Sequence, residues 1–252
     1  MSSSQPLTDP EFWDRFWGNV RLPAFPDASR RYERCFLEIF ERFFKPDPGL
    51  RVFEAGCAPG AWLSYFSRHF GYQAYGCDTS PRGVELTREN FRLCGIAGTV
   101  VQTEFLDVPG EGTFDVVLSL GFIEHFADPG PVLDKHVRLL KPGGVLVLEV
   151  PNLVGLNAWL VTPELLAVHN QTVMNRLFFE DFGRSRGLET LFLGYIGGFE
   201  PDNLGPPRPA LLRRVVLKAL RILRALPGTG KLNSVLFSGF LIGLYRKPRE
   251  VR

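Results

Sequence analysis

The sequence predicts an α/β fold built on a doubly wound, parallel sheet. Three observations predict it. Short apolar runs alternate with helical segments from about residue 50 to residue 150, a glycine-rich turn follows the first apolar run, and the run at 114–120 continues without a break. An uninterrupted strand pattern is expected in a sheet that helices cover on both faces. We therefore expect a central sheet with its helices divided between the two faces.

An amphipathic helix is predicted before the first strand, over residues 29–45. Phe36, Ile39, Phe40 and Phe43 recur there at helical spacing, with Glu and Arg between them. The Pro-Asp-Pro-Gly turn at 46–49 ends it. This segment should therefore dock an apolar face on the rest of the fold.

Strands and helices then alternate in the order expected of βαβ units. Strands are predicted at 51–55, 73–77, 99–102, 114–120 and 145–150, and helices at 61–70, 81–93 and 128–140. A Lys-Pro-Gly-Gly turn at 141–144 is expected to stop the last of these helices. Beyond residue 151 the alternation breaks, and two late strands are predicted at 188–196 and 236–245.

Charge is distributed unevenly along the 252 residues. The whole chain has a net charge of +2, 45% hydrophobic and 22% charged residues, which excludes a collagen, a coiled-coil rod or a disordered chain. Residues 205–252 contain 11 Lys and Arg and one acid, whereas residues 1–204 carry a net charge of −8. The acidic body and the basic tail are therefore expected to face different partners.

Cysteine usage and the chain's start indicate a reducing compartment. Four scattered cysteines form no disulfide scaffold pattern and no CxxC pair, so neither a disulfide framework nor a metal is expected. The first 17 residues lack the basic and apolar regions of a secretory signal, and no apolar stretch approaches the ~20 residues of a membrane span. A cytoplasmic location is expected.

A glycine-rich turn, V-F-E-A-G-C-A-P-G, joins the first predicted strand to the first helix of the alternation. Such a turn lets the backbone approach a ligand closely. Asp78 ends the second strand, 24 residues after Glu54, where an acid accepts hydrogen bonds from both ribose hydroxyls of a nucleoside. NAD and S-adenosylmethionine (SAM) share that ribose, so these two features do not choose between the cofactors.

Four segments, in order, resemble the class I SAM-dependent methyltransferases, in particular the ubiquinone-biosynthesis and methyltransferase type 11/12 group. They are F-E-A-G-C-A-P-G (53–60), Y-G-C-D-T-S (75–80), L-S-L-G-F-I-E-H-F-A-D-P (118–129) and L-L-K-P-G-G-V-L-V-L-E-V-P-N (139–152). The likeness is strong over 50–152 and weak over 170–196. It implies a Rossmann-like sheet of seven strands, mostly parallel with an antiparallel last strand, and helical lid elements.

The resemblance also implies which residues bind the cofactor. Ala58 stands where the family's middle glycine is usual, and Glu104 replaces the usual Asp before Phe105. The implied set comprises a methionine-side turn (Glu54, Gly56, Cys57, Ala58, Gly60), a ribose acid with its adenine-side neighbours (Asp78, Thr79, Ser80), the adenine segment (Glu104, Phe105) and carbonyls near the sulfonium (Leu120, Gly121).

Two histidines are candidate catalytic bases. Methyl transfer is an in-line displacement that needs a base only when the acceptor must lose a proton early. His125 follows the fourth strand, and His169 lies in the segment that contributes to the acceptor pocket of relatives. The alternatives are that His125 anchors its loop or touches the cofactor and that His169 is a surface residue.

The resemblance divides the chain into four regions. Residues 1–48 form an N-terminal helical cover, 49–196 the SAM-binding core with an acceptor-side insertion at 152–187, 197–235 a basic amphipathic lid, and 236–252 the final strand and basic tail. The helix at 208–226 has one apolar and one basic face. It either docks on the sheet or lies on anionic lipid at the inner membrane face. No nucleic-acid partner is expected.

The sequence thus predicts an enzyme that uses SAM, yields S-adenosylhomocysteine, and methylates a small molecule or a glycan or lipid intermediate, at oxygen. One alternative is a non-catalytic SAM-fold binding or scaffold protein. Another is an NAD-dependent oxidoreductase, which the third and fourth segments disfavour. The acceptor, the methylated atom and the oligomeric state stay open.

Overall fold

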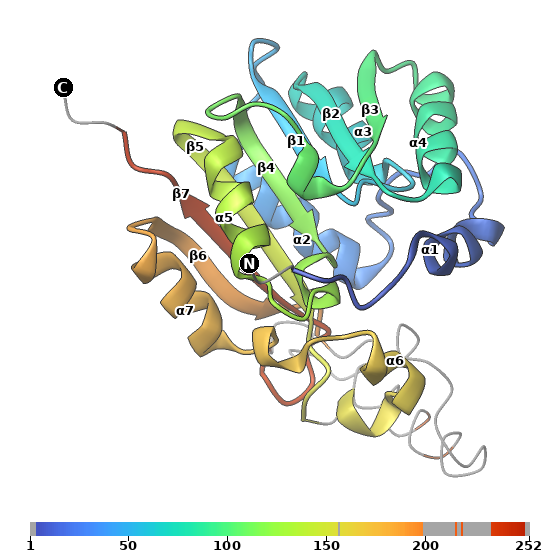
Figure 1. The fold of residues 1–252 in the computed structure, drawn as a ribbon, viewed down its shortest axis with the longest axis vertical. Helices are drawn as coiled ribbons and strands as arrows, with labels where there is room; N and C mark the ends of the chain where they lie inside the picture. The colour runs from blue at the N-terminus through green and yellow to red at the C-terminus, as the bar shows by residue number, and fades with distance from the viewer. Residues whose placement is uncertain (1–3, 156, 199–214, 216–217, 219–232, 250–252) are drawn as a thin grey trace.

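A single seven-stranded sheet organises the computed structural model, which describes residues 4–155, 157–198, 215, 218 and 233–249. The strand order is β3-β2-β1-β4-β5-β7-β6 (Figure 1). Strands β1 to β5 are parallel, whereas β7 runs antiparallel to both β5 and β6. The predicted sheet is confirmed. Its strands are β1 Arg51–Ala55, β2 Gln73–Asp78, β3 Gly98–Gln102, β4 Phe114–Leu120, β5 Leu140–Pro151, β6 Glu189–Ile196 and β7 Phe240–Arg246.

Helices and short helical turns connect the strands. The α-helices are α1 Pro10–Phe16, α2 Arg31–Phe43, α3 Ala61–Tyr65, α4 Pro81–Cys94, α5 Gly130–Leu139, α6 Pro163–Ala167 and α7 Arg176–Ser185. The helix predicted at 61–70 is α3 continued by a π-helical turn, η2 Phe66–Phe70. Within the described part of the chain, no helix is both long and apolar enough to cross a membrane.

Helices cover both faces of the sheet, as a doubly wound fold requires (Figure 1). Side chains of α5 and α7 pack in one core cluster, and those of α2, α3 and α4 in another. Adjacent residues of β4 serve opposite faces: Val116 lies in the second cluster and Val117 in the first, and both are buried. This explains why β4 reads as an uninterrupted strand.

Aromatic packing attaches α2 to α3 and to the turn η2 that continues it. Phe40 is fully buried and contacts the rings of Trp62 and Phe66 at centroid distances of 5.5 and 5.1 Å. Phe36 also packs on Trp62, at 5.3 Å. The helical phenylalanine spacing that predicts this helix therefore reflects its buried face.

The Lys-Pro-Gly-Gly segment was predicted as a turn before the fifth strand, but the structure places it within β5, where it forms an irregularity. Phe114 pairs with Leu140 and Val116 with Val145, so four residues of β5 lie opposite one residue of β4. Gly143 has φ +82°, and a Cβ on Gly144 would come within about 3 Å of two backbone oxygens. The glycines are required because the β5 backbone bends here against β4.

The last strand also differs from its prediction, because β7 begins at Phe240 rather than at residue 236. Residues 234–238 form a turn, and the backbone oxygen of Ser238 accepts hydrogen bonds from Asn152 Nδ2 (2.7 Å) and Asn157 Nδ2 (2.9 Å). These contacts tie the turn to the end of β5. The predicted basic helix at 208–226 and most of the lid at 197–235 lie outside the described residues, apart from 215 and 218.

Removal of the Phe40 ring should destabilise the protein. We expect Phe40→Ala to lower the free energy of unfolding by about 3–5 kcal/mol, because it leaves a buried cavity between α2, α3 and η2. Leu177→Ala is the control, since Leu177 is 70% exposed and should change stability by less than about 0.5 kcal/mol. Urea denaturation measures both, and an equal loss in the two variants would refute the packing role of Phe40.

Candidate functional site

The carboxyl ends of β1 and β2 meet at Asp78, the last residue of β2. Its Oδ2 accepts a hydrogen bond from the N–H of Ala58 at 3.1 Å, and its Oδ1 accepts one from the N–H of Ser80 at 2.9 Å. The N–H of Cys57 donates to the Cys77 carbonyl at 3.0 Å. One buried carboxylate thus joins the glycine-rich turn to the loop after β2, at the edge where open α/β sheets bind ligands.

The turn itself requires glycine at its two ends. Gly56 has φ +64°, and a Cβ there would lie 2.8 Å from the Phe122 ring. Gly60 is the left-handed cap of α3, at φ +81°. Between them, the Ala58 methyl faces Gly83 of α4, where an added Cβ would approach it to 2.8 Å. Ala58 stands where the family's motif usually has its middle glycine, and Gly83 on the facing helix leaves room for the extra methyl group.

Glu54 is a buried acid on β1, next to the turn. Burial raises the pKa of its carboxyl well above the ordinary value, a hydrogen bond from the Leu63 backbone opposes that rise, and the charge of Asp78 adds to it. Its Oε2 is buried without a hydrogen-bond partner among the described residues. A buried acid with a free oxygen favours a ligand that brings a positive charge or a donor.

Helix α1 is fastened beside this turn, where it packs against α4 (Figure 1). The Ser80 hydroxyl donates to Asp14 Oδ1 at 2.5 Å, and the N–H of Arg82 donates to the same oxygen at 3.2 Å. No residue of α1 is fully buried, so these polar contacts contribute to holding it in place. The sequence did not single out Asp14, because its contact is visible only once α1 is placed.

The predicted adenine-side residues lie in different environments. Thr79 is half-buried. Burial raises the pKa of Asp78, and backbone hydrogen bonds, one of them from Thr79, oppose that rise. Glu104 follows β3 near the surface, where the loss of part of its hydration and the charge of Asp107 raise the pKa of its carboxyl. Phe105 instead lies in the core against the ring of His136, 4.3 Å away. The structure gives the Phe105 side chain a packing role.

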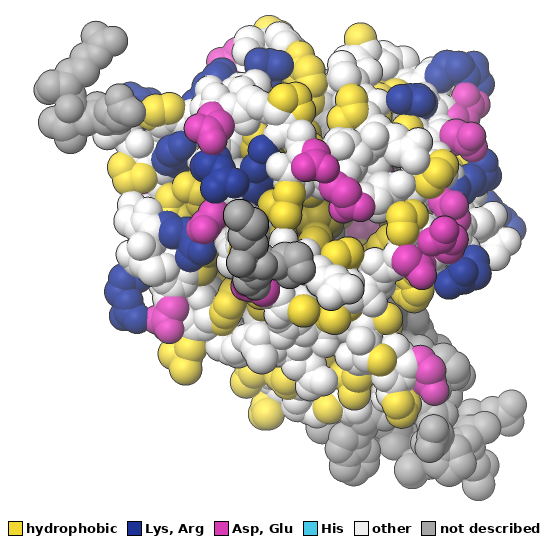
Figure 2. Space-filling model, in the orientation of Figure 1, with side chains coloured by type: hydrophobic (Ala, Val, Ile, Leu, Met, Phe, Trp, Pro, Cys, Tyr) yellow, Lys and Arg dark blue, Asp and Glu magenta, His cyan; other side chains and the backbone are white. Residues whose placement is uncertain are grey.

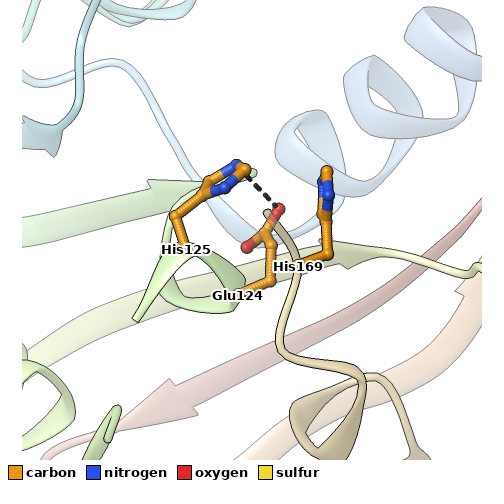
Figure 3. A group of neighbouring side chains, drawn as sticks. All are labelled: Glu124, His125 and His169. Carbon is orange, nitrogen blue, oxygen red and sulfur yellow. Dashed lines mark ion pairs between the residues drawn. The ribbon is translucent and has the colours of Figure 1, made fainter. Parts of the chain in front are cut away.

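The two candidate bases, His125 and His169, lie beside a further buried acid, Glu124. This group follows the carboxyl end of β4, which Leu120 and Gly121 form. Glu124 and His125 belong to the turn η4 Ile123–His125, and His169 follows α6. Figure 3 shows the Glu124 carboxylate beside both imidazoles. The ring centroids of the two histidines are 4.6 Å apart, and His125 Nε2 lies 3.9 Å from Glu124 Oε1.

Asn170 and Trp13 hold this group in place. The N–H of Asn170 donates to the Glu124 carbonyl at 2.6 Å, and its Nδ2 donates to the Phe126 carbonyl at 3.0 Å. Trp13 of α1 packs edge-on against the His125 ring at 4.9 Å. Helix α1 therefore contacts both ends of the site, through Asp14 at the Asp78 loop and through Trp13 at the histidines.

Burial controls the charge of this group. It raises the pKa of Glu124 to about 8, and it lowers the pKa of His125 to about 4, with help from His169. Burial also lowers the pKa of His169 and, together with the charge of Glu124, raises that of Glu149 on β5 well above its ordinary value. Without a ligand, His125 is therefore a neutral imidazole at neutral pH.

Three residues of this site were not predicted from the sequence: Glu124, Glu149 and Asn170. The sequence does mark Glu149 as unusual, since it is the one charged residue in the apolar run V-L-V-L-E-V. Glu124 stands in the quoted E-H-F segment, but only the structure shows that its side chain lies between two imidazoles. The two other histidines stand apart: His136 is buried in the core, and His69 is exposed beside Glu41.

Comparison with known proteins agrees with this geometry. The family model described as a methyltransferase domain matches residues 28–191, more than half of the chain. Ubiquinone biosynthesis O-methyltransferases of Cereibacter sphaeroides (strain ATCC 17025 / ATH 2.4.3) and Caulobacter sp. (strain K31) are similar, at 35% identity over 108 residues and 33% over 148. These matches cover 42% and 56% of this chain and 43% and 58% of the relatives, so the chain spans about half the length of the relatives it matches.

Solved structures share the fold across nearly the whole chain. A SAM-dependent methyltransferase from Aquifex aeolicus matches with a TM-score of 0.58 at 15% identity, covering 95% of this chain and 99% of that one. Geranyl diphosphate C-methyltransferase from Streptomyces coelicolor, solved with S-adenosyl-L-homocysteine, matches with a TM-score of 0.60 at 14% identity, covering 98% and 100%. At these identities the likeness establishes the fold alone.

The attachment of α1 should depend on Asp14. We expect Asp14→Ala to speed amide hydrogen exchange in residues 10–16 at least about tenfold, because α1 has no buried residue to retain it. Exchange in β1 and β4 should not change. Glu11→Ala, at an exposed position of the same helix, is the control. Unchanged exchange in α1 of the Asp14 variant would show that other contacts hold this helix.

Proposed function

The chain belongs to the methyltransferase domain family, as the resemblance in its motifs predicts, and on that premise we propose that it transfers a methyl group from SAM to a hydroxyl oxygen of a small-molecule acceptor. The observation that carries the proposal is the position of Asp78. Its carboxylate is fixed by the N–H groups of Ala58 and Ser80, at the point where the first two strands end. S-Adenosylhomocysteine is the expected product.

The polar groups of the site suit a cationic cofactor. Asp78 would accept the ribose hydroxyls, the turn at 56–60 would hold the methionine part, and the carbonyls of Leu120 and Gly121 would face the sulfonium. Glu54 and Glu149 are buried acids with oxygens that lack partners among the described residues. Since a buried carboxylate is stabilised by a nearby positive charge, a sulfonium fits this edge better than a phosphate does.

Methyl transfer requires mainly that the protein align the acceptor oxygen with the methyl carbon and the sulfur of SAM. The acceptor oxygen forms a bond to the methyl carbon while the bond from that carbon to sulfur breaks, so sulfur leaves as a neutral thioether. Holding the two reactants in line and excluding water supplies much of the acceleration. The acceptor's hydroxyl proton must leave, and the neutral imidazole of His125 is one group that can accept it.

Oxygen is proposed as the methylated atom because the similar curated relatives are O-methyltransferases. The surface around α6 supports an acceptor with apolar character. Figure 2 shows charged side chains concentrated over the sheet and its flanking helices, whereas the region around α6 on the same face is mostly uncharged. A lipid- or glycan-linked acceptor, and contact of 208–226 with anionic membrane, are finer predictions that belong to this proposal.

The cofactor assignment is testable at Asp78. We expect Asp78→Asn to weaken SAM binding by about 10- to 100-fold, because charged hydrogen bonds to the ribose contribute about 1.5–3 kcal/mol. Asp134→Asn, at a surface ion pair with Arg186, should bind normally. Calorimetric titration measures all three proteins. Equal affinity of Asp78→Asn and wild type would refute the ribose role, and no binding by wild type would favour a scaffold protein.

The acceptor atom can be tested by product release. We expect S-adenosylhomocysteine to form with phenol and catechol probes but not with matched amine or thiol probes, because the proposed transfer is to oxygen. A coupled assay for S-adenosylhomocysteine with each probe checks this. Release with the amine or thiol probes alone would overturn the choice of oxygen and leave the cofactor assignment intact.

A further inference from the structure

A carboxylate and two imidazoles converge beside the carboxyl end of β4. One ligand atom each from Glu124, His125 and His169 lies within 4.8 Å of the other two. Figure 3 shows the three side chains directed toward a common point from two separate segments. We propose that these residues bind a divalent transition-metal ion of the Zn²⁺ type. The absence of CxxC pairs, which argued against a metal, concerned cysteine ligands alone.

The two imidazoles are already oriented as metal ligands. His125 Nδ1 lies 2.7 Å from the Val168 carbonyl oxygen, and His169 Nδ1 lies 2.6 Å from the Leu165 carbonyl oxygen. A carbonyl only accepts, so each Nδ1 carries the proton and each Nε2 keeps its lone pair. Metal-ligating histidines are commonly fixed in this way by a backbone carbonyl.

The burial of Glu124 is a second, independent reason to expect a cation here. Its side chain is 1% exposed, and its Oε2 has no hydrogen-bond partner among the residues that the structure describes. Burying an ionised carboxylate without a partner is costly. Glu149 on β5 is also buried, and its Oε1 likewise has no hydrogen-bond partner among the described residues. A metal ion would compensate both acids.

The surroundings hold the three residues together. Asn170, next to His169, is bonded through its N–H to the Glu124 carbonyl and through its Nδ2 to the Phe126 carbonyl. Trp13 packs against the other side of the group, on His125. The ligands are therefore held by neighbouring contacts before any ion binds, which lowers the cost of forming the site.

The donor set selects the class of ion. Two imidazole nitrogens and one carboxylate suit Zn²⁺, Co²⁺ or Fe²⁺, whereas Mg²⁺ and Ca²⁺ prefer oxygen ligands alone. Three protein ligands leave a position for an oxygen from outside. If the proposed function holds, that oxygen is the acceptor's hydroxyl, which loses its proton to water when it binds the ion. His125 is then a ligand rather than the base.

Metal binding is testable on the full chain without any activity assay. Protein stripped with a chelator and dialysed against Zn²⁺ should bind one ion per chain, and Co²⁺ should give visible d–d absorption that Zn²⁺ abolishes and excess Mg²⁺ does not. Glu124→Gln and His169→Gln should each weaken Zn²⁺ binding at least about tenfold. Circular dichroism checks that each variant is folded. If Glu124→Gln does not fold, His169→Gln still tests the proposal, because His169 is only half-buried and its substitution disturbs the core less.

His69→Gln is the matched control. His69 Nε2 also lies 3.9 Å from a glutamate oxygen, of Glu41, but that pair is exposed. Its loss should leave Zn²⁺ binding unchanged. No bound Zn²⁺, binding retained in a folded His169→Gln, or displacement of Co²⁺ by Mg²⁺ would each overturn the proposal. SAM binding by the metal-free protein separates the two proposals, since it supports the methyltransferase whether or not Zn²⁺ binds.

Discussion

The site depends on the two hydrogen bonds that Asp78 accepts from the backbone N–H groups of Ala58 and Ser80. Through them a single buried side chain sets the distance between the turn after β1 and the loop after β2. Ser80 connects this loop to two helices, because its hydroxyl both caps α4 and donates to Asp14 of α1. The turn after β1, where we propose that the cofactor binds, and helix α1 are therefore positioned by one connected set of polar contacts.

A second constraint is the cost of burying acids. Glu54, Glu124 and Glu149 lie at or near the ends of β1, β4 and β5, each with an oxygen that lacks a partner among the described residues. Such groups reduce stability unless something positive binds beside them. The proposed sulfonium and the proposed metal ion would satisfy this requirement at neighbouring points of the same sheet edge. The charge of −8 over residues 1–204 includes these acids.

Local patterns were enough to predict much of the fold. The bounds of β1 and β4 follow from their apolar runs, and the helical phenylalanine spacing locates α2. The Lys-Pro-Gly-Gly segment was wrongly expected to be a turn outside the strand, because its strand character depends on residues far away: the N–H of Gly143 donates to the carbonyl of Lys247. The start of β7 was misplaced for a similar reason, since Ser238 is held in a turn by Asn152 and Asn157.

The sequence brings together only part of the candidate site, for the same physical reason. The turn and Asp78 are near in sequence, so spacing and resemblance suggest that they act together. His125 and His169 are 44 residues apart, and their contact depends on how Asn170 fastens the insertion to η4. A structure of the protein with S-adenosyl-L-homocysteine bound tests the central claim most directly. We predict that the ribose hydroxyls lie on the Asp78 carboxylate and the sulfur beside Gly121. A ligand bound elsewhere, or a ribose away from Asp78, would contradict the proposed cofactor site.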